Sequence, residues 1–132
     1  MAYSIDLSGR VAFVTGASSG LGAQFARVLA RSGAAVVLAA RRIEKLKDLR
    51  AQIEGEGGDA HVVPMDVSDP ASVSGLAWQL DGEKLDVALY VAGVYSTAGA
   101  TQPPAREEFD RLMRTNVLGA MQAIPQVAPM VE

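Results

Sequence analysis

The stretch Val11–Gly22 reads VAFVTGASSGLG, four apolar residues and a threonine running into a glycine-rich turn. A short apolar run without polar alternation is typical of a strand covered on both faces, as in a parallel sheet. An amphipathic helix is expected over Gly22–Ser32, with Phe25, Val28 and Leu29 on one apolar face. A glycine-rich turn between a strand and a helix indicates a phosphate-binding site.

The glycines of this turn have separate expected roles. Gly16 allows a tight exit from the strand, and Gly20 lets the backbone approach a pyrophosphate because it carries no Cβ. Gly22 lets the helix pack close to the sheet, and the N–H groups and positive helix end attract the anion. Three hydroxyl side chains add donors: Thr15, Ser18 and Ser19. No Gly-Lys-Ser/Thr follows, which argues against a P-loop; an ordinary glycine-rich turn without a ligand is the alternative.

The rest of the chain alternates between strand and helix patterns. Further strands are expected over residues 34–40, 61–65 and 85–92. This order predicts an α/β fold: a Rossmann-like, doubly wound parallel sheet of four strands in the order 3-2-1-4, with helices on both faces. We expect one NAD(P)-binding domain over residues 1–132, with a ligand crevice between strands one and four.

Helical periodicity marks the segments between these strands. One helix has a stripe of Ile43, Leu46, Leu49 and Ile53. In another, Asp69 caps the helix before Pro70, with buried positions at Val73, Leu76 and Leu80. The last helix begins near Glu107, and Pro125 and Pro129 are expected to kink or end it. Its expected stripe consists of Phe109, Leu112, Met113, Asn116, Val117, Ala120, Met121 and Ile124.

Composition excludes several classes of function. A net charge of −3 without a basic cluster argues against a nucleic-acid partner. The absence of cysteine excludes disulfides, and His61 alone cannot build a zinc site. No secretory signal pattern is present, and no apolar stretch reaches the ~18 residues of a membrane span. We therefore expect a cytoplasmic protein without a membrane partner.

The end of the second expected strand discriminates between cofactors. An NAD site usually carries Asp or Glu there for the ribose hydroxyls, but this chain has Ala40 followed by Arg41 and Arg42. A guanidinium suits a 2′-phosphate through forked hydrogen bonds, which favours NADP over NAD. The alternative is that both arginines are solvated residues that precede a helix.

Together these segments resemble the short-chain dehydrogenase/reductase family over nearly the whole chain. The spacing T-G-x-x-x-G-x-G from Thr15 is the family's variant of the dinucleotide fingerprint, Asp66-Val67 resembles its adenine-binding acidic position, and Ala92-Gly93 resembles the end of its N-N-A-G motif. The resemblance implies NADP(H) binding and hydride transfer between alcohols and carbonyls. The expected cofactor-binding residues are Gly16, Ser18, Ser19, Gly20, Leu21, Gly22, Arg41, Arg42, Asp66, Val67, Ala92 and Gly93.

Several of these residues have a plain structural alternative. Asp66 could cap the loop that leads to Asp69, and Ala92 and Gly93 could form only a tight strand exit. Asn116 matches the asparagine that supports a proton-relay water in the family, and is the one catalytic candidate. A buried asparagine must also find hydrogen-bond partners, so a purely structural bond to the main chain is its alternative role.

Two departures from the family pattern limit the expected activity. Tyr90-Val91 stands where the family has two asparagines that tie the sheet together. The catalytic serine and the Tyr-x-x-x-Lys motif are absent, and no lysine follows Lys84. The resemblance implies a chain truncated before the fifth strand, inactive on its own without its proton donor. It would act on a small-molecule carbonyl or alcohol substrate only when completed.

Other interpretations remain open at this point. The chain could be a non-catalytic nucleotide-sensing or protein-interaction module, or a fragment whose cofactor site is not properly formed. An unflanked fourth strand would present an apolar edge, so we expect a homo-oligomer that covers it or a rearranged last helix.

Overall fold

The computed structural model describes residues 4–76, 80, 83–94 and 105–131. Its core is a sheet of four strands in the order β3-β2-β1-β4, and every neighbouring pair is parallel. The strands are β1 (Val11–Thr15), β2 (Ala35–Ala40), β3 (Asp59–Pro64) and β4 (Val87–Tyr90). The expected sheet order is confirmed, and β4 is shorter at both ends than the expected strand over residues 85–92.

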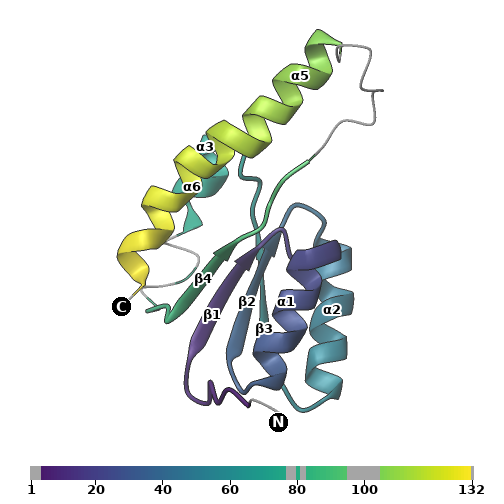
Figure 1. The fold of residues 1–132 in the computed structure, drawn as a ribbon, viewed down its shortest axis with the longest axis vertical. Coiled ribbons are helices and arrows are strands. Elements are labelled where there is room, and N and C mark those ends of the chain that lie inside the picture. The colour runs from purple at the N-terminus through teal and green to yellow at the C-terminus, as the bar shows by residue number, and fades with distance from the viewer. Residues whose placement is uncertain (1–3, 77–79, 81–82, 95–104, 132) are drawn as a thin grey trace.

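Helices cover both faces of this sheet (Figure 1). On one face lie α1 (Gly20–Arg31) and α2 (Ile43–Gly55). On the other lie α3 (Pro70–Ser74) and a long final helix. That helix consists of α5 (Arg106–Met113), a π turn (Arg114–Leu118) and α6 (Gly119–Val127), followed by a 3-10 turn (Ala128–Met130). The architecture is the expected doubly wound fold.

The buried face of α1 differs from the expected one. Phe25 and Val28 are 40% and 48% exposed, whereas the helix buries the small residues Gly22, Ala23, Ala26 and Ala30. Short side chains bring the helix axis close to the sheet, so the large residues turn outward. Of the three large apolar residues that periodicity selects, only Leu29 packs against the core, and it is partly buried.

The next two helices follow the expected pattern. Leu46, Leu49 and Ile53 are buried on α2. Asp69 caps α3 by accepting a hydrogen bond of 3.0 Å from the N–H of Ala71. The three apolar residues expected to be buried in and after this helix are buried: Val73, Leu76 and Leu80. Residues 77–79, which the expected helix would include, lie outside the described residues.

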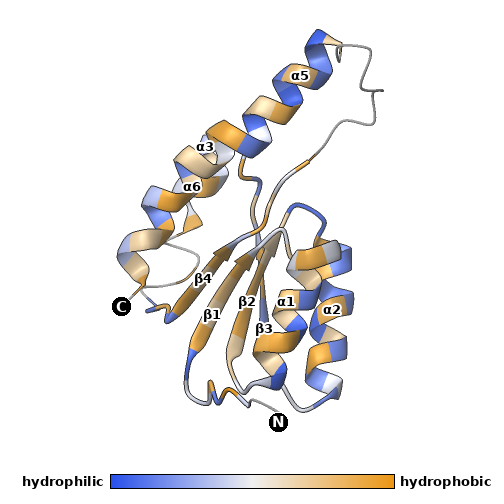
Figure 2. Cartoon of the chain, viewed as in Figure 1, coloured by the Kyte–Doolittle hydropathy of each residue, from blue (hydrophilic) through white to orange (hydrophobic). Residues whose placement is uncertain are grey.

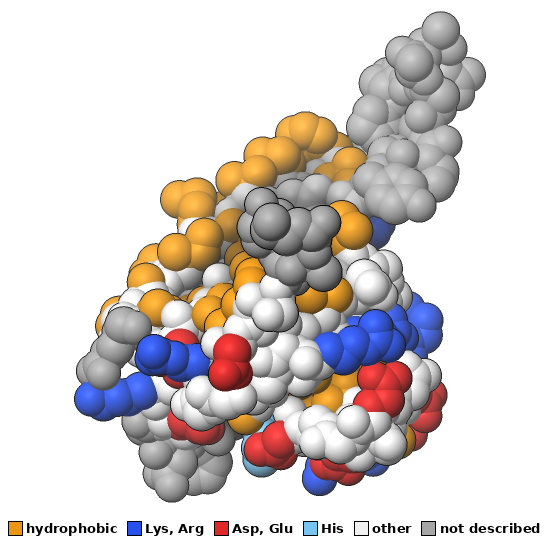
Figure 3. All heavy atoms as spheres, turned by 60° about the horizontal axis from the view of Figure 1, so that its bottom comes forward, with side chains coloured by type: hydrophobic (Ala, Val, Ile, Leu, Met, Phe, Trp, Pro, Cys, Tyr) orange, Lys and Arg blue, Asp and Glu red, His pale blue; other side chains and the backbone are white. Residues whose placement is uncertain are grey.

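The last helix also corrects an expectation. Its sheet-facing side consists of Gly119, Ala123 and Val127, and Pro125 lies inside α6 without ending it. The expected apolar stripe largely faces outward, with these residues exposed: Phe109, Met113, Val117, Met121 and Ile124. Figure 2 shows apolar residues recurring along this helix, and Figure 3 shows hydrophobic side chains gathered over that part of the surface. As on α1, small residues make the close contact with the sheet, and most of the larger apolar residues are exposed.

Strand β4 is an edge of the described sheet, as expected. It pairs with β1 on one side, and Asp86 anchors its start by accepting from the N–H of Val11 at 2.8 Å. On the other side Leu85 forms an isolated parallel bridge with Val131 and donates to the carbonyl of Met130 at 2.7 Å.

Among the described residues no helix has the length and apolar character that a membrane crossing requires.

Candidate functional site

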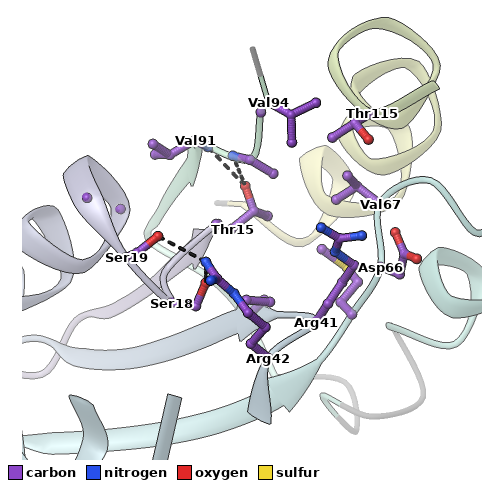
Figure 4. Close-up of a pocket in the computed structure, with 18 of the residues that line it drawn as sticks. Thr15, Ser18, Ser19, Arg41, Arg42, Asp66, Val67, Val91, Val94 and Thr115 are labelled. Atoms are coloured by element: carbon purple, nitrogen blue, oxygen red, sulfur yellow. Dashed lines mark hydrogen bonds between the residues drawn. The ribbon is translucent and has the colours of Figure 1, made fainter. Parts of the chain in front are cut away.

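A pocket of about 420 Å³ lies at the carboxyl ends of the parallel strands (Figure 4). This is the crevice expected where the strand order reverses, between β1 and β4. All twelve expected cofactor-binding residues line it, from Gly16 in the glycine-rich turn to Gly93 beyond β4. The sequence positions are far apart, and the fold brings them together around one cavity.

Glycine is required at two points of the turn because backbone approaches backbone. Gly16 has a φ of +67°, and a Cβ there would lie 2.8 Å from the N and Cα of Ala92. A Cβ at Gly22 would lie 2.1 Å from the carbonyl oxygen of Gly16. Gly20 differs: its φ is +58°, but nothing lies within 4 Å of the position its Cβ would take. The turn thus folds tightly beneath an open space.

The start of α1 faces this space with free donors. Ser19 occupies the N-cap position, and its side chain makes no capping bond. Within the described part of the chain, the N–H groups of Leu21 and Gly22 have no hydrogen-bond acceptor. Unpaired N–H groups and the positive end of a twelve-residue helix favour an anion here, so the turn fits a phosphate group.

The two arginines after β2 behave differently. Arg42 reaches back to the turn, and its Nη2 donates to the Oγ atoms of Ser18 and Ser19, each at 3.1 Å. A hydroxyl oxygen that accepts from Arg42 keeps its own proton to donate to a ligand. Arg41 extends beside Val67, as Figure 4 shows. Among the described residues its guanidinium has no hydrogen-bond or ion-pair partner.

Asp66 makes hydrogen bonds within the loop that leads to Asp69, as expected from its alternative, structural role. Its Oδ1 accepts from the N–H of Ser68 at 2.9 Å and from the Ser68 hydroxyl at 2.7 Å. The Asp66 N–H in turn donates to the Ser72 hydroxyl at 2.9 Å. Its Oδ2 has no protein partner within the described ranges, so the carboxylate can still accept a hydrogen bond from a ligand while Oδ1 holds the loop.

Thr15 corrects the expectation that its hydroxyl serves the phosphate. The side chain is buried, and its Oγ1 accepts from the N–H groups of Val91 and Ala92 at 3.0 and 3.3 Å. Its proton goes to the carbonyl of Leu89 at 3.4 Å. Thr15 therefore joins the end of β1 to the end of β4 and to the two residues that follow Tyr90.

Asn116 lies beside the pocket and bonds the main chain. Its Oδ1 accepts from the N–H of Val94 at 2.8 Å, and its Nδ2 donates to the Val94 carbonyl at 2.6 Å. This pair of hydrogen bonds to the main chain matches the structural alternative. These bonds hold Val94, the residue after Gly93, and Asn116 itself is not among the pocket-lining residues.

Tyr90 supplies a second contact to the last helix. Its hydroxyl donates to the carbonyl of Thr115 at 3.4 Å. Burial raises the pKa of Tyr90 above its ordinary value near 10, so the hydroxyl keeps its proton at neutral pH.

Sequence reasoning missed several lining residues: Ala39, Met65, Val91, Val94 and Thr115. Ala39 lies near the end of a strand, and Met65, Val91 and Val94 follow one. The expected crevice at the carboxyl ends of the parallel strands could therefore have indicated all four. Thr115 gave no signal, because its approach depends on how the last helix packs. Within the described residues no three His, Asp or Glu side chains gather into a metal site.

Comparisons with known proteins agree with this geometry. A family model described as short chain dehydrogenase matches residues 10–132. An oxidoreductase of Mycobacterium tuberculosis is 38% identical over 130 residues, which cover 93% of this chain and 38% of the relative. A fatty acyl-CoA reductase of Acinetobacter baylyi is 33% identical over 127 residues, which cover 94% of this chain and 43% of the relative.

Solved structures give the same result. A short-chain type dehydrogenase/reductase from Mycobacterium marinum matches with a TM-score of 0.85 and 38% identity, over 95% of this chain and 51% of that one. A metagenomic short-chain oxidoreductase in complex with NADP matches with a TM-score of 0.85 and 36% identity, over 94% and 57%. The chain thus spans about half the length of these structures and less of the two curated relatives. It belongs to the short-chain dehydrogenase family of oxidoreductases, whose members bind nicotinamide dinucleotides.

Proposed function

We propose that this chain is the NADP(H)-binding portion of a short-chain oxidoreductase that transfers hydride between an alcohol and a carbonyl. The observation that carries the proposal is the open space above Gly20, bordered by the free N–H groups of α1 and by Arg41. Free donors and a guanidinium around one cavity favour a ligand with several phosphate charges.

Each part of the dinucleotide has candidate residues. The turn from Gly16 to Gly22 would hold the pyrophosphate. Arg41 would pair with the 2′-phosphate, supported by the serine hydroxyls that Arg42 orients. The free Oδ2 of Asp66 would accept from the adenine amino group. The bound cofactor supplies the hydride, and these residues supply binding and orientation.

Cofactor preference tests the assignment of Arg41. In Arg41→Ala, the dissociation constant for NADPH should rise about tenfold or more, because a charge-assisted hydrogen bond to phosphate is lost. NADH affinity should barely change, because NADH lacks that phosphate. Arg27→Ala removes the same charge outside the pocket, where Arg27 donates to Gln52, and serves as the control. Equal losses for NADPH and NADH in Arg41→Ala would contradict the assignment.

The same proposal makes the 132-residue chain inactive, or nearly so, by itself. No tyrosine in it is followed four residues later by lysine, and a missing general acid typically lowers the rate by ~10²–10⁴. Asn116 remains the one candidate here for proton-relay support. Rapid NADPH-dependent carbonyl reduction by the pure chain would contradict this part of the proposal.

A further inference from the structure

The last helix lies against the loop after β3 at Gly119. Gly119 is buried, and a Cβ there would lie 2.9 Å from Cγ2 and 3.2 Å from Cβ of Val67. It would also lie 3.1 Å from the hydroxyl oxygen of Tyr90. Valine is stiff about χ1, so an added methyl group would have to displace the Val67 backbone or the helix. The absence of a side chain at Gly119 therefore sets this spacing.

Gly119 and Tyr90 meet at one turn of the helix. The N–H of Gly119 closes the π turn by donating to the carbonyl of Arg114, five residues earlier. The Tyr90 hydroxyl donates to the next carbonyl, that of Thr115, at 3.4 Å. The Tyr90 hydroxyl thus bonds the turn at Thr115 and lies beside Gly119, which closes it. Tyr90 stands where the family resemblance leads us to expect an asparagine.

The residue next to Gly119 across the loop and the residue bonded by Tyr90 are both part of the pocket wall. Val67 and Thr115 line the cavity, and Figure 4 places their side chains near one another at the end where Arg41 and Asp66 lie. The spacing between the loop after β3 and the last helix therefore bounds that end of the pocket. A purine ring needs a flat slot with apolar walls, which the methyl groups of these two side chains can form.

We propose that Tyr90 and Gly119 are positioning residues that together set the width of the adenine end of this pocket. The inference rests on the proposed function, because it takes the ligand at that end to be the adenosine part of NADP(H). It assigns to Tyr90 a role distinct from tying the sheet together, since its hydroxyl acts on the helix.

Gly119→Ala tests the spacing, with 2′,5′-ADP as the probe because it contains only the adenosine half of the cofactor. Displacement of Val67 or Thr115 should raise the dissociation constant of 2′,5′-ADP by about tenfold. Gly55→Ala is the matched control: Gly55 also lies in a helix, but nothing stands within 4 Å of its Cβ position. That control should bind 2′,5′-ADP like the wild type.

The double variant Tyr90→Phe/Gly119→Ala tests whether the two residues act together. Removing the hydroxyl vacates space that the new methyl group can enter, so part of the lost affinity should return. Tyr90→Phe alone should raise the dissociation constant by only about threefold, because it removes one long hydrogen bond. Additive losses in the double variant, or unchanged binding in Gly119→Ala, would overturn the inference.

A second measurement separates this inference from the proposed function. The Val67 methyl resonances should shift in Gly119→Ala and move back toward their wild-type positions in the double variant. If wild-type chain binds neither 2′,5′-ADP nor NADPH, the proposed function fails, and so does the adenine assignment. If it binds both while the Val67 resonances do not respond to Gly119→Ala, the proposed function stands and the positioning role is wrong.

Discussion

Gly22 lies so close to Gly16 that a Cβ on Gly22 would stand 2.1 Å from the Gly16 carbonyl oxygen. This approach ties the first turn of α1 to the exit of β1, and it places the free N–H groups of the helix at the floor of the pocket. The geometry of the proposed phosphate site therefore depends on the missing side chain of Gly22 as well as on that of Gly16.

Gly22→Ala should destabilise the chain strongly, because the methyl group meets backbone atoms that have little freedom to move. We expect the free energy of unfolding to fall by at least about 3 kcal/mol and dinucleotide binding to be lost. Urea denaturation and an NADPH titration would measure both effects. Gly55→Ala, with open space around it, should leave both nearly unchanged; a Gly22→Ala chain as stable as the control would contradict the turn geometry.

Replacing Thr15 tests the link between the two central strands. Thr15→Val should leave the N–H groups of Val91 and Ala92 without their acceptor and lower the stability by about 1–3 kcal/mol. Thr15→Ser keeps the hydroxyl and should retain most of the lost stability. Chemical denaturation of the three proteins would decide, and equal stability for the valine and serine variants would count against the link.

Arg42→Ala tests whether the arginine prepares the serines of the turn. Its bonds to Ser18 and Ser19 lie on the surface, so we expect little change in stability. Loss of the oriented hydroxyls should weaken NADPH binding several-fold. Calorimetric titration would measure this, with Arg27→Ala as the charge-matched control. Unaltered NADPH affinity would show that the serines need no such support.

Asp86 gives the stability a dependence on acid pH. Its carboxylate accepts from the N–H of Val11 and from Arg10, and these contacts lower its pKa below the ordinary 3.8. Because the folded pKa is depressed, the stabilisation is present above pH 3.8 and is lost as the pH falls through the folded value. In Asp86→Asn this contribution should be absent, so the free energy of unfolding should fall less between about pH 5 and pH 2. If the free energy of unfolding of Asp86→Asn fell with acid as much as that of the wild type, this role would be contradicted.

Two exposed features favour self-association: the edge that β4 forms in the described sheet and the outward apolar side of the last helix. We expect the isolated chain to form dimers or larger assemblies that cover them. Sedimentation should show Met121→Glu shifted toward monomer, because Met121 is 67% exposed on that helix. Ile5→Glu, at a residue 70% exposed near the N-terminus, is the control. A wild-type monomer with freely exchanging β4 amides would contradict the expectation.

The sequence predicted the parts of this molecule that depend on local chemistry. The spacing of Gly16, Gly20 and Gly22 fixes a strand, a turn and a helix together, and the alternation of elements then determines the order of the sheet. Packing partners were harder to predict. The alanine face of α1 and the small residues of α6 make the close contacts, whereas a search for large apolar residues selects mostly exposed positions. Thr15 was misassigned for a similar reason: its proton goes to β4, and only the strand register shows this.

We propose that the pocket binds NADP(H) through the turn at Gly16–Gly22 and prefers it to NAD(H) through Arg41. Calorimetric titration of the 132-residue chain with NADPH and with NADH tests it most directly. We predict saturable binding of both, with a dissociation constant for NADPH about tenfold or more below that for NADH. No binding of either cofactor, or tighter binding of NADH, would contradict it.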